Sequence, residues 1–171
     1  STDSEVLRIL ARAGYRKKMK EGGLDKNREA EYAARVNKEF ESLEKTNFIP
    51  YILLVWMILR FVEKNDLARG SSRGSAGSSL INYLIGITEI DPIEHDLYFE
   101  RFISVTRSKT NWVNEIPFII GPPDIDIDLG DEARKKVIEY LSEKYKGKFV
   151  KLSTYGTKTT KALIKDAGKI L

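Results

Sequence analysis

The sequence contains no cysteine and only one histidine among its 171 residues. The lack of cysteine excludes disulfide bonds and thiolate metal sites, and it is compatible with a reducing, cytoplasmic environment. A single histidine excludes zinc sites with several histidine ligands and leaves little room for a Ser-His-Asp triad. His95 lies between Glu94 and Asp96 without metal-ligand spacing, which favours a surface position.

Long apolar runs are also lacking. The longest extends from Ile49 to Leu59, which is shorter than the roughly 18 residues that a membrane span needs. It is not N-terminal, so it does not resemble a signal peptide, and we predict a buried helix and no membrane partner. With 42% hydrophobic and 32% charged residues the composition is typical of a globular protein. The net charge of +4 permits nucleic-acid binding but does not establish it.

Apolar residues at helical spacing predict a mainly helical first third of the chain. The predicted helices cover about residues 3–20, 27–45, 51–64 and 131–146, and a last helix begins at Thr157. Residues 104–121 are expected to form an irregular connection.

Three aspartates alternate with isoleucines in the segment 122–129. Residues two apart in a strand point to the same face, so we expect Asp124, Asp126 and Asp128 on one face of a strand. Like charges stacked in this way favour a compensating cation, and Mg²⁺ with its preference for oxygen ligands is the natural one. The alternative is an exposed strand edge with solvated charges.

The segment 70–79 is rich in glycine and serine and contains one arginine. It leads directly into the apolar residues 80–85, which must be packed. Such a loop can present backbone N–H groups to an anion, so we favour a phosphate loop over a flexible linker.

Lysines recur at spacings of three, four and four in the last predicted helix. Lys158, Lys161 and Lys165 therefore share one helix face. This face is either simply solvated or directed at a nucleic-acid backbone.

Taken together and in this order, the motifs resemble the palm domain of the C-family DNA polymerases, the replicative DNA polymerase III alpha subunits of bacteria and phages. The resemblance is carried by five segments, namely 70–80, 86–92, 99–102, 123–128 and 155–157. The apolar residues 48–56 are also similar in kind to the family's helix before the Gly/Ser loop.

This resemblance assigns roles to individual residues. It implies that Asp124 and Asp126 are catalytic and bind two Mg²⁺ ions, with Asp128 in a supporting role. It also implies that Gly74 and Ser75 contact the phosphates of the incoming dNTP, with Arg101 nearby. Arg73 is a weaker phosphate-binding candidate, and the three lysines are candidates for DNA binding.

The resemblance also predicts the architecture. We expect an α/β (α+β) fold like that of polymerase-beta-like nucleotidyltransferases, with a mixed sheet that carries the aspartates and helices packed against it. Residues 1–68 would be a helical lead-in, 69–152 the palm core and 153–171 the start of the thumb. The family's third catalytic aspartate and its fingers are expected in the remainder of the polymerase, so this fragment is expected to be inactive alone.

The predicted function is therefore template-directed DNA synthesis, with primer-template DNA and dNTP as partners. Two alternatives stay open. One is a nucleotidyltransferase that uses an acceptor other than DNA, against which the lysine-rich helix argues. The other is a non-catalytic, DNA-binding module with a palm-like fold, against which the intact set of candidate site residues argues.

Overall fold

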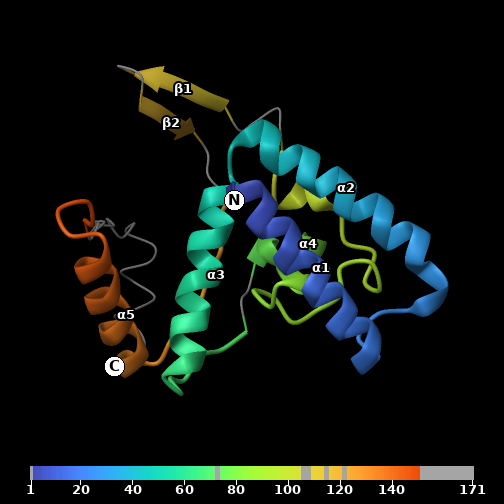
Figure 1. The fold of residues 1–171 in the computed structure, drawn as a ribbon, viewed down its shortest axis with the longest axis horizontal. Coiled ribbons are helices and arrows are strands. Elements are labelled where there is room, and N and C mark those ends of the chain that lie inside the picture. The colour runs from blue at the N-terminus through green and yellow to red at the C-terminus, as the bar shows by residue number, and fades with distance from the viewer. Residues whose placement is uncertain (1, 72–73, 105–108, 114–115, 121–122, 151–171) are drawn as a thin grey trace, which may run out of the picture. The chain divides into compact units, whose positions relative to one another are not determined.

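The computed structural model describes residues 2–71, 74–104, 109–113, 116–120 and 123–150 (Figure 1). The chain divides into two compact units, Ser1–Val137 and Ile138–Leu171. The division falls inside the last described helix, α5 (Asp131–Lys144), and the fold below is that of the first unit. The predicted domain limits after residues 68 and 152 stay predictions.

Local sequence signals define the ends of the first two long helices. In α1 (Asp3–Glu21), the side chain of Thr2 accepts from the backbone N–H of Glu5, and the Glu5 side chain accepts from the backbone N–H of Thr2. This capping box satisfies two N–H groups that lack helical partners. The short turn η1 (Lys26–Arg28) precedes α2 (Glu29–Thr46), and α2 ends where Asn47 takes a left-handed conformation with φ 57°.

Helix α3 (Ile49–Lys64) follows Asn47 after a single residue and carries Pro50 in its first turn, where proline is tolerated. These positions confirm three of the predicted helices to within two or three residues. The long helices contribute to the buried apolar core, with Leu7 of α1, Phe40 of α2 and Leu59 of α3 among its members, and many of the other core residues lie between Ala76 and Ile103.

The Gly/Ser segment forms the turn η2 (Gly74–Ser78) and leads into the short helix α4 (Leu80–Leu84). Every residue of α4 is buried, and α4 contacts both α1 and α2 (Figure 1). Gly14 makes the close approach of α1 possible, because a Cβ atom at Gly14 would lie 1.9 Å from the carbonyl oxygen of Leu84. The prediction that residues 80–85 are packed is confirmed.

Residues 104–121 are not an irregular connection throughout. Strands β1 (Lys109–Val113) and β2 (Ile116–Ile120) pair as an antiparallel hairpin, with Trp112 opposite Pro117 and Val113 opposite Ile116. The two-residue spacing between Val113 and Ile116 is typical of a tight hairpin. Pro117 lacks a backbone donor, which disfavours it inside a sheet, but a two-stranded hairpin has outer edges where proline is tolerated.

The predicted α/β fold with a mixed sheet is wrong. The described residues are mostly helical, and their strands are limited to the β1–β2 hairpin, which does not include the aspartates. The aspartate segment contributes only isolated bridges, such as the antiparallel one between Arg69 and Leu129. The alternation of aspartates with isoleucines predicts an extended segment with one apolar face, but it does not predict which strand, if any, pairs with it. Here the apolar face packs against the helical core.

In the part of the chain that the structure describes, no single helix is both long and apolar enough to cross a membrane. The pair Lys26–Thr46 and Ile49–Lys64 meets those criteria together, with a bend of 109° between the two parts.

Candidate active site

The aspartate segment presents its carboxylates outward and its isoleucines inward. Asp124 and Asp126 are exposed, Asp128 is half-buried, and both Ile125 and Ile127 pack against the core. Exposure therefore alternates over residues 124–127 as the sequence predicts, but not at Asp128, which is half-buried like Ile127 and Leu129. Apolar packing on one side turns the first two aspartates toward solvent.

The Gly/Ser loop meets this segment at three points. A Cβ atom at Gly74 would lie 3.3 Å from Oδ2 of Asp126, and Gly74 has a φ of +78° that favours glycine. The Ser75 hydroxyl lies 3.5 Å from the carbonyl oxygen of Asp124. The backbone N–H of Gly70 donates to the carbonyl oxygen of Asp128 at 2.8 Å. The structure thus brings Gly74 and Ser75 to Asp124 and Asp126.

Helix α3 supports the aspartate segment through Tyr51. This residue was not among those predicted for the site from the sequence. Burial raises the pKa of the Tyr51 hydroxyl, and the nearby carboxylate of Asp124 raises it further. The same hydroxyl forms a hydrogen bond with the backbone of Ile125. Tyr51 is one of many apolar or aromatic residues in α3, so no sequence signal distinguishes it.

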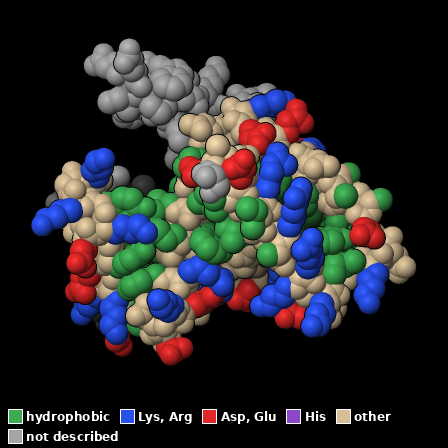
Figure 2. All heavy atoms as spheres, in the orientation of Figure 1, with side chains coloured by type: hydrophobic (Ala, Val, Ile, Leu, Met, Phe, Trp, Pro, Cys, Tyr) green, Lys and Arg blue, Asp and Glu red, His purple; other side chains and the backbone are tan. Residues whose placement is uncertain are grey.

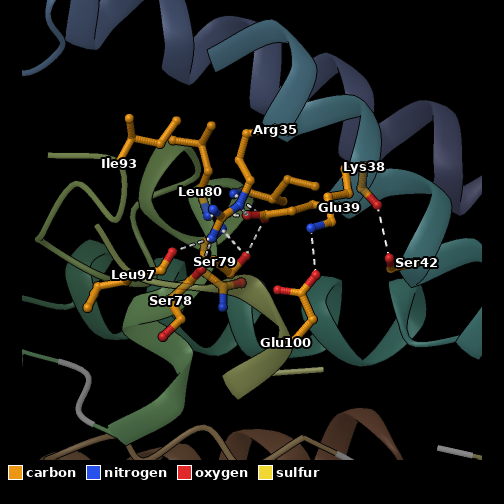
Figure 3. A network of polar contacts seen from close by, with 12 residues as sticks. Arg35, Lys38, Glu39, Ser42, Ser78, Ser79, Leu80, Ile93, Leu97 and Glu100 are labelled. Carbon is orange, nitrogen blue, oxygen red and sulfur yellow. Dashed lines mark hydrogen bonds and ion pairs between the residues drawn. The ribbon is translucent and has the colours of Figure 1, made fainter. Parts of the chain in front are cut away.

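Helix α2 anchors the other end of the Gly/Ser loop through Glu39, whose side chain is fully buried (Figure 3). The carboxylate accepts from the Ser79 hydroxyl at 2.8 Å and from the backbone N–H groups of Leu80 at 2.8 Å and Ile81 at 3.0 Å. Nε of Arg35 supplies a fourth hydrogen bond at 2.8 Å. Burial raises the pKa of Glu39, and these four donors oppose that rise.

Arg35 and Glu39 were not predicted as site residues from the sequence. Their i,i+4 spacing on a predicted helix is that of an ordinary surface ion pair. One weak signal exists, since Glu39 directly precedes the buried Phe40.

Arg101 lies on the turn η3 (Phe99–Arg101), which contacts η2. Its side chain is exposed. Two residues of α2 hold the turn: Arg35 donates to the carbonyl oxygen of Leu97 at 2.8 Å, and Lys38 pairs with Glu100 at 2.5 Å (Figure 3). The structure therefore places the turn that carries Arg101 beside the Gly/Ser loop.

The chemistry of Asp124 and Asp126 fits a hard divalent cation. Both are exposed carboxylates on one face, and no lysine or arginine among the described residues pairs with either of them. Mg²⁺ in proteins commonly takes one or two carboxylates together with substrate phosphates. No group of three acidic or histidine side chains suited to a metal occurs within the described ranges, so the structure does not bring Asp124, Asp126 and Asp128 together as one such group.

Comparison with known proteins decides the family. The family model described as the bacterial DNA polymerase III alpha NTPase domain matches residues 5–171. The chain belongs to this family. The resemblance drawn from the five motifs is thereby confirmed.

Individual DNA polymerase III alpha subunits are similar along most of the chain. The protein of Aquifex aeolicus is 36% identical over 171 residues, which cover 99% of this chain and 14% of that protein. The protein of Ureaplasma parvum is 37% identical over 169 residues, or 98% of this chain and 16% of that protein. That of Thermotoga maritima is 39% identical over 133 residues, or 78% of this chain and 14% of that protein. The chain thus spans about a seventh of the relatives' length.

Four of the predicted site residues lie outside the described residues. They are Arg73 and the lysines Lys158, Lys161 and Lys165. Basic and acidic side chains are interspersed on the face that Figure 2 shows. The charges on that face therefore do not indicate a DNA-binding surface among the described residues. The DNA-binding role of Lys158, Lys161 and Lys165 stays a prediction.

Two cavities in the described part of the chain are not lined by the aspartates of the segment 122–129. One has a volume of about 300 Å³, with Arg12, Tyr15 and Phe40 among its lining residues. The other has a volume of about 390 Å³, with Tyr83 and Asp91 among its lining residues. The candidate site is instead formed by exposed carboxylates beside a glycine turn, an arrangement open to a large substrate.

Proposed function

We propose that this chain carries the nucleotide- and metal-binding part of a replicative DNA polymerase. The whole protein would transfer a deoxynucleotide from a dNTP to the 3′-hydroxyl of a primer, as the template directs. Membership of the DNA polymerase III alpha family supports this proposal. The observation that carries it is the proximity of the loop to the aspartates: a Cβ atom at Gly74 would lie 3.3 Å from Oδ2 of Asp126, and the Ser75 hydroxyl lies 3.5 Å from the carbonyl oxygen of Asp124.

In this proposal the carboxylates of Asp124 and Asp126 hold Mg²⁺, and Asp128 has a supporting role. Two bound Mg²⁺ ions would lower the pKa of the attacking hydroxyl and neutralise charge on the triphosphate. The family resemblance implies a third carboxylate from another part of the whole protein. That ligand would complete the site next to the primer hydroxyl.

The glycine turn and the arginines bind the triphosphate in this proposal. The backbone N–H groups of Gly74 and Ser75 and the Ser75 hydroxyl can donate to phosphate oxygens. Arg101 and Arg73 would stabilise negative charge as it develops. The primer oxygen then bonds to the α-phosphorus while the bond to pyrophosphate breaks.

The remaining partners follow from the same function. Primer-template DNA would contact the thumb, for which Lys158, Lys161 and Lys165 are the candidates. Replication of bacterial DNA implies a cytoplasmic location for the whole protein.

A primer-extension assay on the full-length protein tests this proposal. Mg²⁺-dependent extension should fall by several orders of magnitude in Asp124→Ala and in Asp126→Ala, because each removes a metal ligand. Asp128→Asn should be milder, because it removes only the charge of a supporting residue.

Asp131→Asn is the matched control, since Asp131 is an exposed acidic residue of the same region at the start of α5. It should extend primers like the unaltered protein. Equal losses at all three aspartates would contradict the proposed ranking. An unaltered protein that extends no primer with Mg²⁺ and dNTP would overturn the function itself.

A further inference from the structure

The buried pair Arg35–Glu39 joins the two segments that the proposed function assigns to the triphosphate. Both residues lie on α2, far in sequence from those segments, and neither belongs to the motifs of the sequence analysis. Their side chains are 17% and 0% exposed, respectively. A buried ion pair is costly to desolvate and is not by itself a good source of stability, so its contacts indicate what else it does.

Glu39 fixes the end of the Gly/Ser loop. Its carboxylate accepts three hydrogen bonds from Ser79, Leu80 and Ile81, which are consecutive residues at the end of the loop and the start of α4 (Figure 3). The backbone N–H groups of Leu80 and Ile81 are therefore already occupied by a protein carboxylate. A phosphate could therefore bind only at the other end of the loop, where Gly74 and Ser75 lie close to the aspartates.

Arg35 connects the loop to the turn that carries Arg101. One guanidinium nitrogen, Nη2, donates both to the carbonyl oxygen of Ser78 at 2.7 Å and to that of Leu97 at 2.8 Å. Ser78 ends η2, and Leu97 lies just before η3. A planar guanidinium can serve these two acceptors and Glu39 at once in a fixed geometry, which a lysine ammonium cannot reproduce.

We propose that Arg35 and Glu39 are positioning residues that set the Gly/Ser loop and the Arg101 turn in register for the nucleotide triphosphate. This inference rests on the proposed function, since it concerns the same site. Neither side chain needs to touch the nucleotide. The pair acts through the backbone carbonyl groups of Ser78 and Leu97 and through the hydroxyl of Ser79. Its loss would therefore displace donors from the phosphates without removing them.

Steady-state kinetics of the full-length protein with primer-template and dNTP test the proposal. In Arg35→Lys and in Glu39→Gln the KM for dNTP should rise about tenfold, the scale of one lost or misplaced hydrogen bond. The Kd for primer-template, measured by fluorescence anisotropy, should stay within about twofold, because the pair acts on the triphosphate segments. Active-site titration corrects kcat for protein that is not folded.

The matched control is Glu41→Gln on the same helix. Glu41 pairs with Lys45, and both side chains are more than half exposed, at 66% and 58%. It should leave the KM for dNTP unchanged. Arg35→Lys retains the charge and keeps the proposal testable if Glu39→Gln does not fold.

Two contrary outcomes are distinguishable. If Arg35→Lys only lowers the titrated fraction of active protein while the KM for dNTP is unchanged, the pair is merely structural and the inference is overturned. If the unaltered protein incorporates no dNTP, the proposed function fails, and the inference falls with it.

Discussion

The Gly/Ser loop and the aspartate segment meet at Gly74, yet the protein holds them in different ways. The loop ends in buried polar contacts: Arg35 donates to the carbonyl oxygen of Ser78, and Glu39 accepts from the Ser79 hydroxyl and from the backbone N–H of Leu80. The following helix α4 packs against α1 and α2. The aspartate segment is held by its isoleucines and by a few backbone contacts, such as that of Asp128 with Gly70. Its first two carboxylates stay exposed.

This difference matches the ligands proposed for the two regions. Neutral N–H donors must be fixed in direction to bind phosphate, because each contributes only in a narrow range of angles. A carboxylate ligand can adjust through its own side-chain torsions to a cation that carries most of the local charge. We therefore expect the loop to be sensitive to changes in packing and the aspartate segment to changes in charge.

The largest expected effect is that of Gly14→Ala, which tests the packed region. The new Cβ atom would lie 1.9 Å from the carbonyl oxygen of Leu84, so α1 and α4 must separate. We expect the opening free energy of α4 to fall by about 2 kcal/mol or more, a cost typical of overpacking. Amide hydrogen exchange in the full-length protein measures this quantity.

Gly130→Ala is the control for Gly14→Ala. Its Cβ atom would lie 3.6 Å from Cβ of Ala68, an ordinary contact, so exchange in α4 should be unchanged. If Gly14→Ala also left α4 unchanged, the loop would not depend on this packing, and the contrast between the regions would fail.

A smaller effect is expected where the two regions meet. Gly74→Ala places a side chain at a φ of +78° and 3.3 Å from Oδ2 of Asp126. The strain of this conformation is roughly 1–2 kcal/mol, and we expect the KM for dNTP to rise by about tenfold. The affinity for primer-template, measured by anisotropy, should change much less.

Gly77→Ala serves as the control for Gly74→Ala, because it lies in the same turn and its Cβ atom would meet only the end of the flexible Ile90 side chain, at 3.3 Å. A fall in DNA affinity with an unchanged KM for dNTP would show that the Gly74 turn contacts DNA instead.

The smallest effect is expected for Lys38 and Glu100, an exposed counterpart of the buried pair. Their side chains are 57% and 54% exposed, so a double-mutant cycle with Lys38→Gln and Glu100→Gln should give at most about 0.5 kcal/mol. The hydrogen bond from Lys38 lowers the pKa of Glu100 below its usual value of 4.5.

The lowered pKa of Glu100 fixes the sign of the pH dependence. The contribution of the pair is fully present above the usual pKa of 4.5 and is lost as the pH falls through the lowered value. Hydrogen exchange of η3, corrected for intrinsic rates, should show this loss in the unaltered protein but not in Glu100→Gln. An equal pH response in both would assign it to another group.

Those features of the site that depend on residues close together in the sequence could be predicted from it. Alternation was enough to turn Asp124 and Asp126 outward, and the Gly/Ser composition marked the turn that reaches them. The spacing of apolar residues gave the long helices, and capping residues such as Thr2 and Asn47 agree with where they end.

What could not be predicted depends on contacts between distant residues. Nothing near Glu39 in the sequence indicates that Ser79, forty positions away, donates to it. The mixed sheet was wrong because the apolar face of Ile125 and Ile127 fits a helical core as well as it fits a sheet. The hairpin was missed because Pro117 argues against a strand unless the strand is known to lie at an edge.

The bend between α2 and α3 connects the two helices that support the Gly/Ser loop and the aspartate segment. α2 holds the loop through Arg35 and Glu39, α3 touches the aspartate backbone through Tyr51, and the helices meet at a bend of 109° beside Asn47. Each helix therefore supports one of the two regions. We therefore expect a substitution that changes the angle at Asn47 to change the distance between the phosphate donors of the loop and the carboxylates of the aspartate segment.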